Sequence, residues 1–187
     1  MAHRVCPWWI GYLLASPLRR LQHDPARILQ PYVREGMTVL EPGPGMGFFT
    51  LELARLVGAS GRVVAVDIQP KMLEALKRRA AKAGLLARVE ARLGRADSLG
   101  LAGLESAVDF VLAFAMVHEM PSAAAFFAQS AAAMKPGAVM LLAEPAGHVK
   151  PADFDEELAA AAGAGLRVAA RPHINRSLTA ALEKGAL

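Results

Sequence analysis

Glycines and an acid gather in one short segment that could hold a ligand. Residues 43–47 read Gly-Pro-Gly-Met-Gly, and Glu41 lies two residues before the first glycine. Glycine allows positive φ angles and has no Cβ, so backbone amides in such a segment can closely approach a bound molecule. A carboxylate beside the loop favours a ligand with a cationic or amino group and disfavours a pyrophosphate. The segment therefore predicts a binding loop for a small, partly cationic ligand.

Two other kinds of glycine loop fit this spacing less well. A dinucleotide loop places its third glycine where this chain has Phe48, and that loop would indicate a nucleotide-dependent oxidoreductase. A phosphate-binding loop of the Gly-Lys-Ser/Thr type is excluded because those residues do not follow. A glycine-rich turn without any ligand remains the alternative for the loop taken alone.

Further acids each follow a predicted strand. They are Asp67, Asp97, Glu119 and Glu144, in addition to Glu41. Because the carboxyl ends of parallel strands meet at one edge of a sheet, and ligands bind beyond that edge, these acids are expected to surround a common site. The repeated placement carries more weight than any single motif.

The elements that must position these residues alternate along the chain. Near-continuous apolar runs predict strands, and helical spacing of apolar residues predicts helices between them. Strands are expected at 37–41, 61–67, 87–93, 108–115 and 138–143, with weaker candidates at 166–170 and 177–183. Helices are expected at 51–57, 71–83, 122–134 and 152–162. This alternation predicts βαβ units, hence an α/β fold with a mostly parallel sheet.

Composition excludes several classes of protein. With 187 residues, 54% hydrophobic and 20% charged, the chain fits one folded α/β domain and does not fit a disordered protein. The net charge of +4 is modest, and no basic stripe is interleaved with aromatic residues, so nucleic-acid binding is not expected. A single cysteine cannot form an internal disulfide, and no Cys/His spacing indicates a metal site. A cytoplasmic location is the simplest expectation.

Residues 1–36 are interpreted as an N-terminal helical arm or lid. Asp24 followed by Pro25 predicts a helix start, and Gly36 is expected to end that helix. The apolar run 5–15 follows a basic residue, which leaves a targeting segment as the alternative. The run is too short to span a bilayer, so packing on the domain is preferred.

Taken together, these segments resemble the class I S-adenosylmethionine-dependent methyltransferases. The matching segments are 41–47, 66–67, 94–98 and 113–119, with the turn Lys135-Pro136-Gly137 before the fifth strand. The nearest branch is the small-molecule one that includes the quinone-biosynthesis methyltransferases. The resemblance implies a Rossmann-like three-layer sandwich at 37–187, with a mostly parallel seven-stranded sheet whose last strand is antiparallel. It also implies S-adenosylmethionine as the cofactor.

The resemblance implies a role for each matched residue. The loop should meet the methionine part of the cofactor, and Asp67 should accept hydrogen bonds from the two ribose hydroxyls. Asp97 should accept from the adenine amine, with a backbone group of Ala96 or Ser98 reading a ring nitrogen. The remaining expected contacts are to the methionine part (Glu41, Gly43, Pro44, Gly45, Gly47 and Phe48), to the adenine faces (Ile68 and Met72, the latter also a core candidate) and beneath the sulfonium (Phe114 and Ala115).

The acceptor is expected to be small and apolar or aromatic, methylated by in-line displacement. His118 and Glu119 are candidate bases, because histidine titrates near neutral pH; the alternative is that His118 caps the next helix or shapes the pocket. Trp8, Trp9 and Tyr12 are candidates for the acceptor pocket.

The resemblance is incomplete in the part that should cover the acceptor. The stretch after the fifth strand is short for a quinone methyltransferase, so the arm, the tail or a partner subunit in a homodimer is expected to close the site. One cysteine argues against the metalloid methyltransferases. Two alternative functions remain. One is an oxidoreductase, although the sequence has no Tyr-x-x-x-Lys pair to support it, and the other is a non-catalytic cofactor-binding module.

Overall fold

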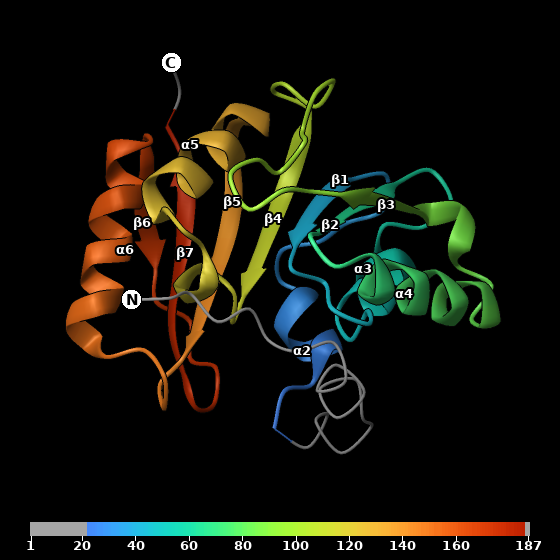
Figure 1. Ribbon diagram of the computed structural model, residues 1–187, viewed down its shortest axis with the longest axis horizontal. Helices are drawn as coiled ribbons and strands as arrows, with labels where there is room; N and C mark the ends of the chain where they lie inside the picture. The colour runs from blue at the N-terminus through green and yellow to red at the C-terminus, as the bar shows by residue number, and fades with distance from the viewer. Residues whose placement is uncertain (1–21, 186–187) are drawn as a thin grey trace.

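One seven-stranded sheet forms the centre of the protein (Figure 1). The computed structural model describes residues 22–185. The strand order is β3-β2-β1-β4-β5-β7-β6, and β7 runs antiparallel to both of its neighbours while the other pairs are parallel. The strands are β1 (Thr38–Pro42), β2 (Arg62–Asp67), β3 (Val89–Leu93), β4 (Val108–Phe114), β5 (Met134–Pro145), β6 (Leu166–Ala170) and β7 (Ser177–Lys184). The predicted sheet, with its antiparallel last strand, is confirmed.

Helices cover both faces of the sheet and complete the expected three layers. On one face, α2 (Pro25–Leu29) and α3 (Thr50–Leu56) share an apolar core with the sheet, and α4 (Pro70–Lys82) packs beside them on β2 and β3. The opposite face is covered by α5 (Ala123–Ala133) and α6 (Pro151–Gly163), whose phenylalanines join the larger core. Two single-turn helices, η2 (Leu86–Arg88) and η3 (Val117–Glu119), follow α4 and β4.

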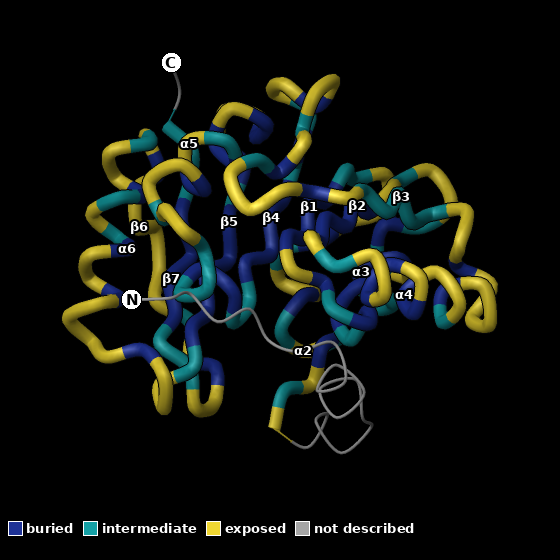
Figure 2. Tube along the Cα trace, in the orientation of Figure 1, coloured by how far each residue is buried: buried dark blue, intermediate teal, exposed yellow. Residues whose placement is uncertain are grey.

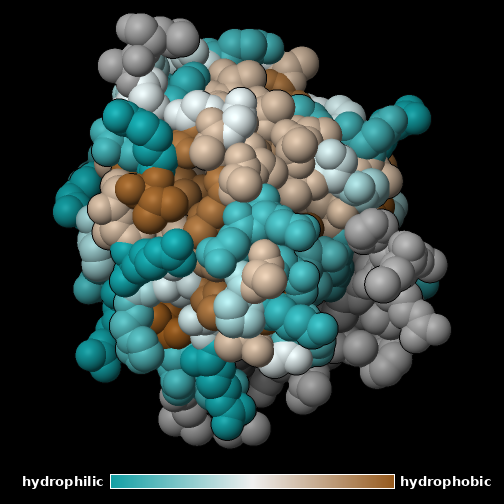
Figure 3. All heavy atoms as spheres, turned by 90° about the vertical axis from the view of Figure 1, so that its left-hand side faces the viewer, coloured by the Kyte–Doolittle hydropathy of each residue, from teal (hydrophilic) through white to brown (hydrophobic). Residues whose placement is uncertain are grey.

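Burial follows the position of each strand in the sheet. Dark-blue buried stretches run through β1, β4 and β5, which have neighbours on both sides (Figure 2). The edge strands β3 and β6 are more open: Leu93 is 60% exposed and Val168 is 46% exposed. At the end formed by α6 and β6, apolar patches lie among polar ones (Figure 3). No helix in the described range is long and apolar enough to cross a membrane.

The first described helix begins where expected and ends early. The Asp24 carboxylate accepts a hydrogen bond from the Ala26 amide at 3.0 Å and so caps α2. The predicted end at Gly36 is wrong, because α2 stops at Leu29. Pro31 explains the early stop, since proline has no amide hydrogen and its ring clashes with the preceding turn.

The turn expected before the fifth strand is also wrong. β5 starts at Met134, so Lys135-Pro136-Gly137 lies inside the strand. The pairing with β4 shifts there: Val108 faces Met134, and Phe110 faces Val139. The extra residues form a bulge, which accommodates both the proline and the positive φ of Gly137.

Candidate functional site

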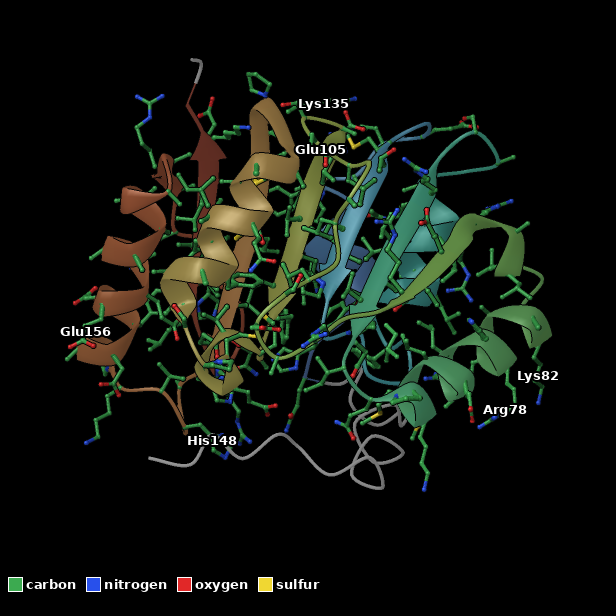
Figure 4. The ribbon with its side chains drawn as sticks, turned by 45° about the horizontal axis from the view of Figure 1, so that its top comes forward. Arg78, Lys82, Glu105, Lys135, His148 and Glu156 are labelled. Carbon is green, nitrogen blue, oxygen red and sulfur yellow. The ribbon has the colours of Figure 1, made fainter. Side chains whose placement is uncertain are left out.

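A cavity lies at the carboxyl ends of β1, β2 and β4. It comprises about 1120 Å³ of empty space, part of which is open solvent. This end of the sheet carries His148, after β5, and lies opposite Lys135 near the start of that strand (Figure 4). The lining residues are Pro42, Gly43, Pro44, Gly45, Met46, Phe48, Val66, Asp67, Ile68, Gln69, Met72, Gly94, Arg95, Leu99, Phe114, Ala115, Met116, Glu119 and Met120. Ten of the predicted site residues are therefore brought together.

The glycine loop forms one wall, and its glycines have different uses. Gly43 donates its amide hydrogen to the Val66 carbonyl at 2.8 Å, which ties the loop to β2. Gly45 lines the cavity, and a Cβ at this position would meet nothing within 4 Å. Gly47 lies outside the lining, and a Cβ there would stand 2.4 Å from Leu76 Cδ1 of α4. The structure thus gives Gly47 a packing use. Predicted contact residue Glu41 is buried in β1 and does not line the cavity either.

Asp67 places a nearly buried carboxylate in the opposite wall. One of its oxygens, Oδ1, accepts a hydrogen bond from the Gln69 amide at 2.8 Å. Burial raises the pKa of Asp67 to about 6, against the lowering effect of amide donors that include Gln69 and Gly45; the nearby charge of Glu119 raises it further. A nearly buried carboxylate in such a wall favours a ligand that brings hydroxyl donors or positive charge.

The residues expected at the adenine end are only partly in place. Ile68 and Met72 line the cavity, together with Leu99. The Asp97 side chain is 80% exposed, pairs with Arg95 at 3.5 Å and lies outside the lining, as does Ala96.

Ser98, whose backbone was expected to read an adenine ring nitrogen, lies outside the cavity lining. The Ser98 amide donates to the Arg95 carbonyl at 3.1 Å, and Arg95 donates back to the Ser98 carbonyl at 2.7 Å. Ser98 is therefore occupied within its own turn, and Gly94 and Arg95 supply the wall in its place.

Aromatic side chains surround the end of β4. Phe114 and Phe48 both line the cavity. The Phe114 ring lies 4.5 Å from Phe49 and 5.2 Å from the His23 ring, between centroids. Ala115 follows with φ of +56°, a left-handed conformation unusual for alanine, and lines the cavity as predicted. The other aromatic candidates, Trp8, Trp9 and Tyr12, lie outside the described residues.

A histidine–carboxylate pair adjoins the cavity. His118 Nδ1 is hydrogen-bonded to Glu144 Oε2. Glu144 is fully buried, and its Oε1 accepts from the Met116 and Val117 amides at 3.2 and 2.8 Å. His118 Nε2 lies 4.0 Å from Oε1 of Glu119, a residue in the cavity wall. His118 and Glu144 do not themselves line the cavity, so the pair lies behind Glu119 in that wall.

The hydrogen bond to Glu144 controls the proton on His118. That bond raises the pKa of His118, while burial acts in the opposite direction. Because Nδ1 carries the proton donated to Glu144, Nε2 is the nitrogen left to accept a proton in the neutral ring. His118 does not cap the next helix, since the Ser122 hydroxyl accepts from the Ala125 amide at 3.1 Å and caps α5.

Sequence reasoning missed several parts of this site. Glu144 was recognised only as an acid after a strand, although its pairing with His118 could be suspected because both residues follow neighbouring strands. Arg79, which donates from its guanidinium to the Met46 carbonyl and so holds the loop, looks like any basic residue of an exposed helix face.

Within the described residues, no group of three His, Cys, Asp or Glu side chains could hold a metal ion.

The sequence matches a known family model over most of its length. Residues 33–174 match the family described as a methyltransferase domain. The chain is 31% identical over 143 residues to a ubiquinone biosynthesis O-methyltransferase of Methylocella silvestris, covering 75% of this chain and 53% of that protein. It is 35% identical over 115 residues to a ribosomal protein L11 methyltransferase of Pelotomaculum thermopropionicum, covering 62% and 34%. The chain therefore spans about half, or less, of these relatives.

The fold agrees with a solved structure of the same class. A SAM-dependent methyltransferase from Aquifex aeolicus superposes with a TM-score of 0.86 at 24% identity, covering 96% of this chain and all of that chain. The family match and the fold together establish that this chain belongs to the class I S-adenosylmethionine-dependent methyltransferases. S-adenosylmethionine is the cofactor of that class, and the resemblance stated from the sequence is confirmed.

Proposed function

We propose that the protein transfers a methyl group from S-adenosylmethionine to a small apolar or aromatic acceptor. The observation that carries the proposal is the placement of the glycine loop, the buried Asp67 carboxylate and Glu119 around one cavity, with the His118–Glu144 pair behind Glu119. When bound, the cofactor would supply a methyl group on a positively charged sulfonium; in-line attack on the methyl carbon would bond it to the acceptor atom and release the thioether, S-adenosylhomocysteine. The protein has to align the acceptor and keep water away.

The charges and apolar residues of the cavity wall support this cofactor. Asp67 and Glu119 put two carboxyl groups into a largely apolar wall, which suits a ligand with ammonium and sulfonium charges. Asp67 would hold the ribose hydroxyls, and the Gly45 backbone would meet the methionine part. Ile68 and Met72 would cover the adenine ring. These acids would repel a pyrophosphate, which supports S-adenosylmethionine over a dinucleotide as the cofactor.

The aromatic side chains at the end of β4 support an apolar or aromatic acceptor. Phe48 and Phe114 would offer their rings to it, since aromatic rings pack well against flat apolar molecules. We further propose that residues 1–36 form an arm that covers the acceptor side of the cavity in domain 37–187. His23, one of the described residues of that arm, contacts Phe114 and donates from Nε2 to the Asn175 carbonyl at 3.0 Å.

His118 is the proposed base. Its Nε2 would accept the proton that the acceptor loses as its nucleophilic atom bonds to the methyl carbon. Glu144 fixes the ring and stabilises the imidazolium that results. Glu119, whose Oε1 lies 4.0 Å from His118 Nε2, would help to orient the imidazole ring toward the acceptor.

A transfer assay with labelled S-adenosylmethionine tests this function. The acceptor panel contains small phenols, thiols and carbon acids, with transfer RNA and ribosomal protein as competing classes. We expect label in a small acceptor only, and a loss of at least about 100-fold in kcat for His118→Gln with unchanged cofactor affinity. Label in RNA or protein alone would overturn the small-molecule proposal, and full turnover by His118→Gln would remove the base.

A further inference from the structure

Glu144 contacts two different parts of the site with its two carboxylate oxygens. Oε2 is hydrogen-bonded to the His118 imidazole, and Oε1 accepts from the Met116 and Val117 amides at 3.2 and 2.8 Å. Met116 is the N-cap of η3 and supplies no side-chain cap. The fully buried carboxylate of Glu144 therefore satisfies the first amide donors of this turn.

The turn that Glu144 holds has an unfavourable backbone conformation. Ala115 has a φ of +56°, in the left-handed region that the Cβ of alanine disfavours. Its amide donates to the Ala143 carbonyl of β5 at 2.7 Å. Such a conformation persists only where the surroundings enforce it, and here β5 does so through the Ala143 carbonyl before the turn and the Glu144 carboxylate after it.

The same turn places Met116 against the glycine loop. Met116 is 8% exposed and lines the cavity. A Cβ built on Gly43 would stand 3.1 Å from Met116 Cβ and 3.4 Å from its Cγ, so the methionine leaves no room for a side chain there. Gly43 in turn donates its amide hydrogen to the Val66 carbonyl at 2.8 Å. A continuous set of contacts therefore runs from Glu144 through Met116 to the loop.

We propose that Glu144 is a positioning residue for the cofactor as well as for His118. By accepting from the two amides, it keeps Ala115 left-handed and Met116 against Gly43, and the loop is then held where it can bind the methionine part of S-adenosylmethionine. The inference rests on the proposed function, which gives the loop this ligand and His118 its proton. One buried carboxylate thereby fixes the cofactor wall and the base relative to each other.

Two substitutions of Glu144 separate its two contacts, with calorimetric titration of S-adenosylhomocysteine as the measurement. In Glu144→Gln, the side-chain oxygen can still accept from both backbone amides. Its NH2 group then faces His118 Nδ1, which moves the ring proton to Nε2. The affinity should stay within about twofold of the original, while methyl transfer falls at least about 100-fold. Glu144→Leu has no acceptor, so its affinity should fall about tenfold.

The substitution Ala115→Gly tests whether the turn transmits this effect. Glycine adopts a positive φ without the cost that alanine bears, so the turn depends less on the carboxylate. Added to Glu144→Leu, it should restore about fivefold in affinity, and in the original protein it should change the affinity by less than about twofold. His118→Gln, which removes only the other contact of Glu144, should bind like the original. No recovery in the double variant, or an equal loss in His118→Gln, would overturn the proposal.

Amide hydrogen exchange in the free protein tests the same coupling without any ligand. The Gly43 amide is bonded to Val66 rather than to Glu144, yet it should exchange at least about tenfold faster in Glu144→Leu and at the original rate in Glu144→Gln. The control Ala161→Gly weakens α6, whose main contacts are with α5, β6 and β7.

Unchanged exchange at Gly43 in folded Glu144→Leu, or an equal change in Ala161→Gly, would overturn the proposal. Failure of the original protein to bind S-adenosylhomocysteine would instead contradict the proposed function, and it would leave the exchange result standing.

Discussion

Asp67 is the residue at which cofactor binding and pH should be linked. Its pKa in the free protein lies near 6 because the carboxyl group is buried, and hydroxyl donors of a ligand would bind the ionised form more strongly. Protonation below pH 6 therefore competes with binding. We expect the affinity for S-adenosylhomocysteine to fall about tenfold between pH 7 and pH 5, as measured by calorimetric titration.

The variant Asp67→Asn separates protonation of Asp67 from any unspecific loss of structure at low pH. It should bind about 10- to 100-fold more weakly at pH 7, since hydrogen bonds to a charged group are lost, and its affinity should not change between pH 7 and pH 5. Asp155→Asn, an exposed acid on α6, serves as the control and should behave like the original protein. A retained pH dependence in folded Asp67→Asn would contradict the assignment.

At this scale the sequence predicts residue types better than side-chain directions. Asp67 and Phe114 lie in the cavity wall because each is the last residue of a strand, and Glu119 lies there at the end of η3, the single turn that follows β4. Asp97 occupies an equivalent place in the chain, yet its carboxylate pairs with Arg95 in solvent. Nothing in the sequence indicates that Glu157 is buried, because only the packing of α6 on the sheet decides that Glu157 faces inward and Glu156 faces solvent.

The connection between the loop and α4 can be tested through Gly47. A Cβ at this position would meet both a positive φ of +83° and Leu76 Cδ1 at 2.4 Å. Gly84 has a similar φ of +70° with nothing within 4 Å, so it isolates the backbone cost. We expect Gly84→Ala to lower the free energy of unfolding by about 1 kcal/mol and Gly47→Ala by about 2 to 4 kcal/mol, measured by urea denaturation. Equal losses would show that the contact with Leu76 is unimportant.

Elements were predictable where a local signal sets them. The Asp24 cap placed the start of α2, and the apolar run before Asp67 placed β2 to within one residue. The end of α2 was placed too late, at Gly36, because Pro31 already prevents the helix from continuing past Leu29. The start of β5 was missed for a different reason: pairing with β4 recruits a Lys-Pro-Gly segment that reads locally as a turn.

The whole molecule brings the site together through its strand order. β1 and β4 are neighbours at the centre of the sheet, so the loop after β1 and the residues after β4 meet although about 70 positions separate them. The alternation of strands and helices was enough to predict this parallel arrangement. Which residues close the acceptor side could not be predicted, because no local pattern in the sequence indicates what covers the end of β4.

The identity of the cofactor is the central claim for the whole molecule. Parallel calorimetric titrations with S-adenosylmethionine, S-adenosylhomocysteine and NAD test it most directly. The cavity, with its two carboxyl groups and without a pyrophosphate loop, predicts saturable binding of the first two compounds and none of NAD. Binding of NAD alone, or of none of the three by the folded protein, would contradict the account.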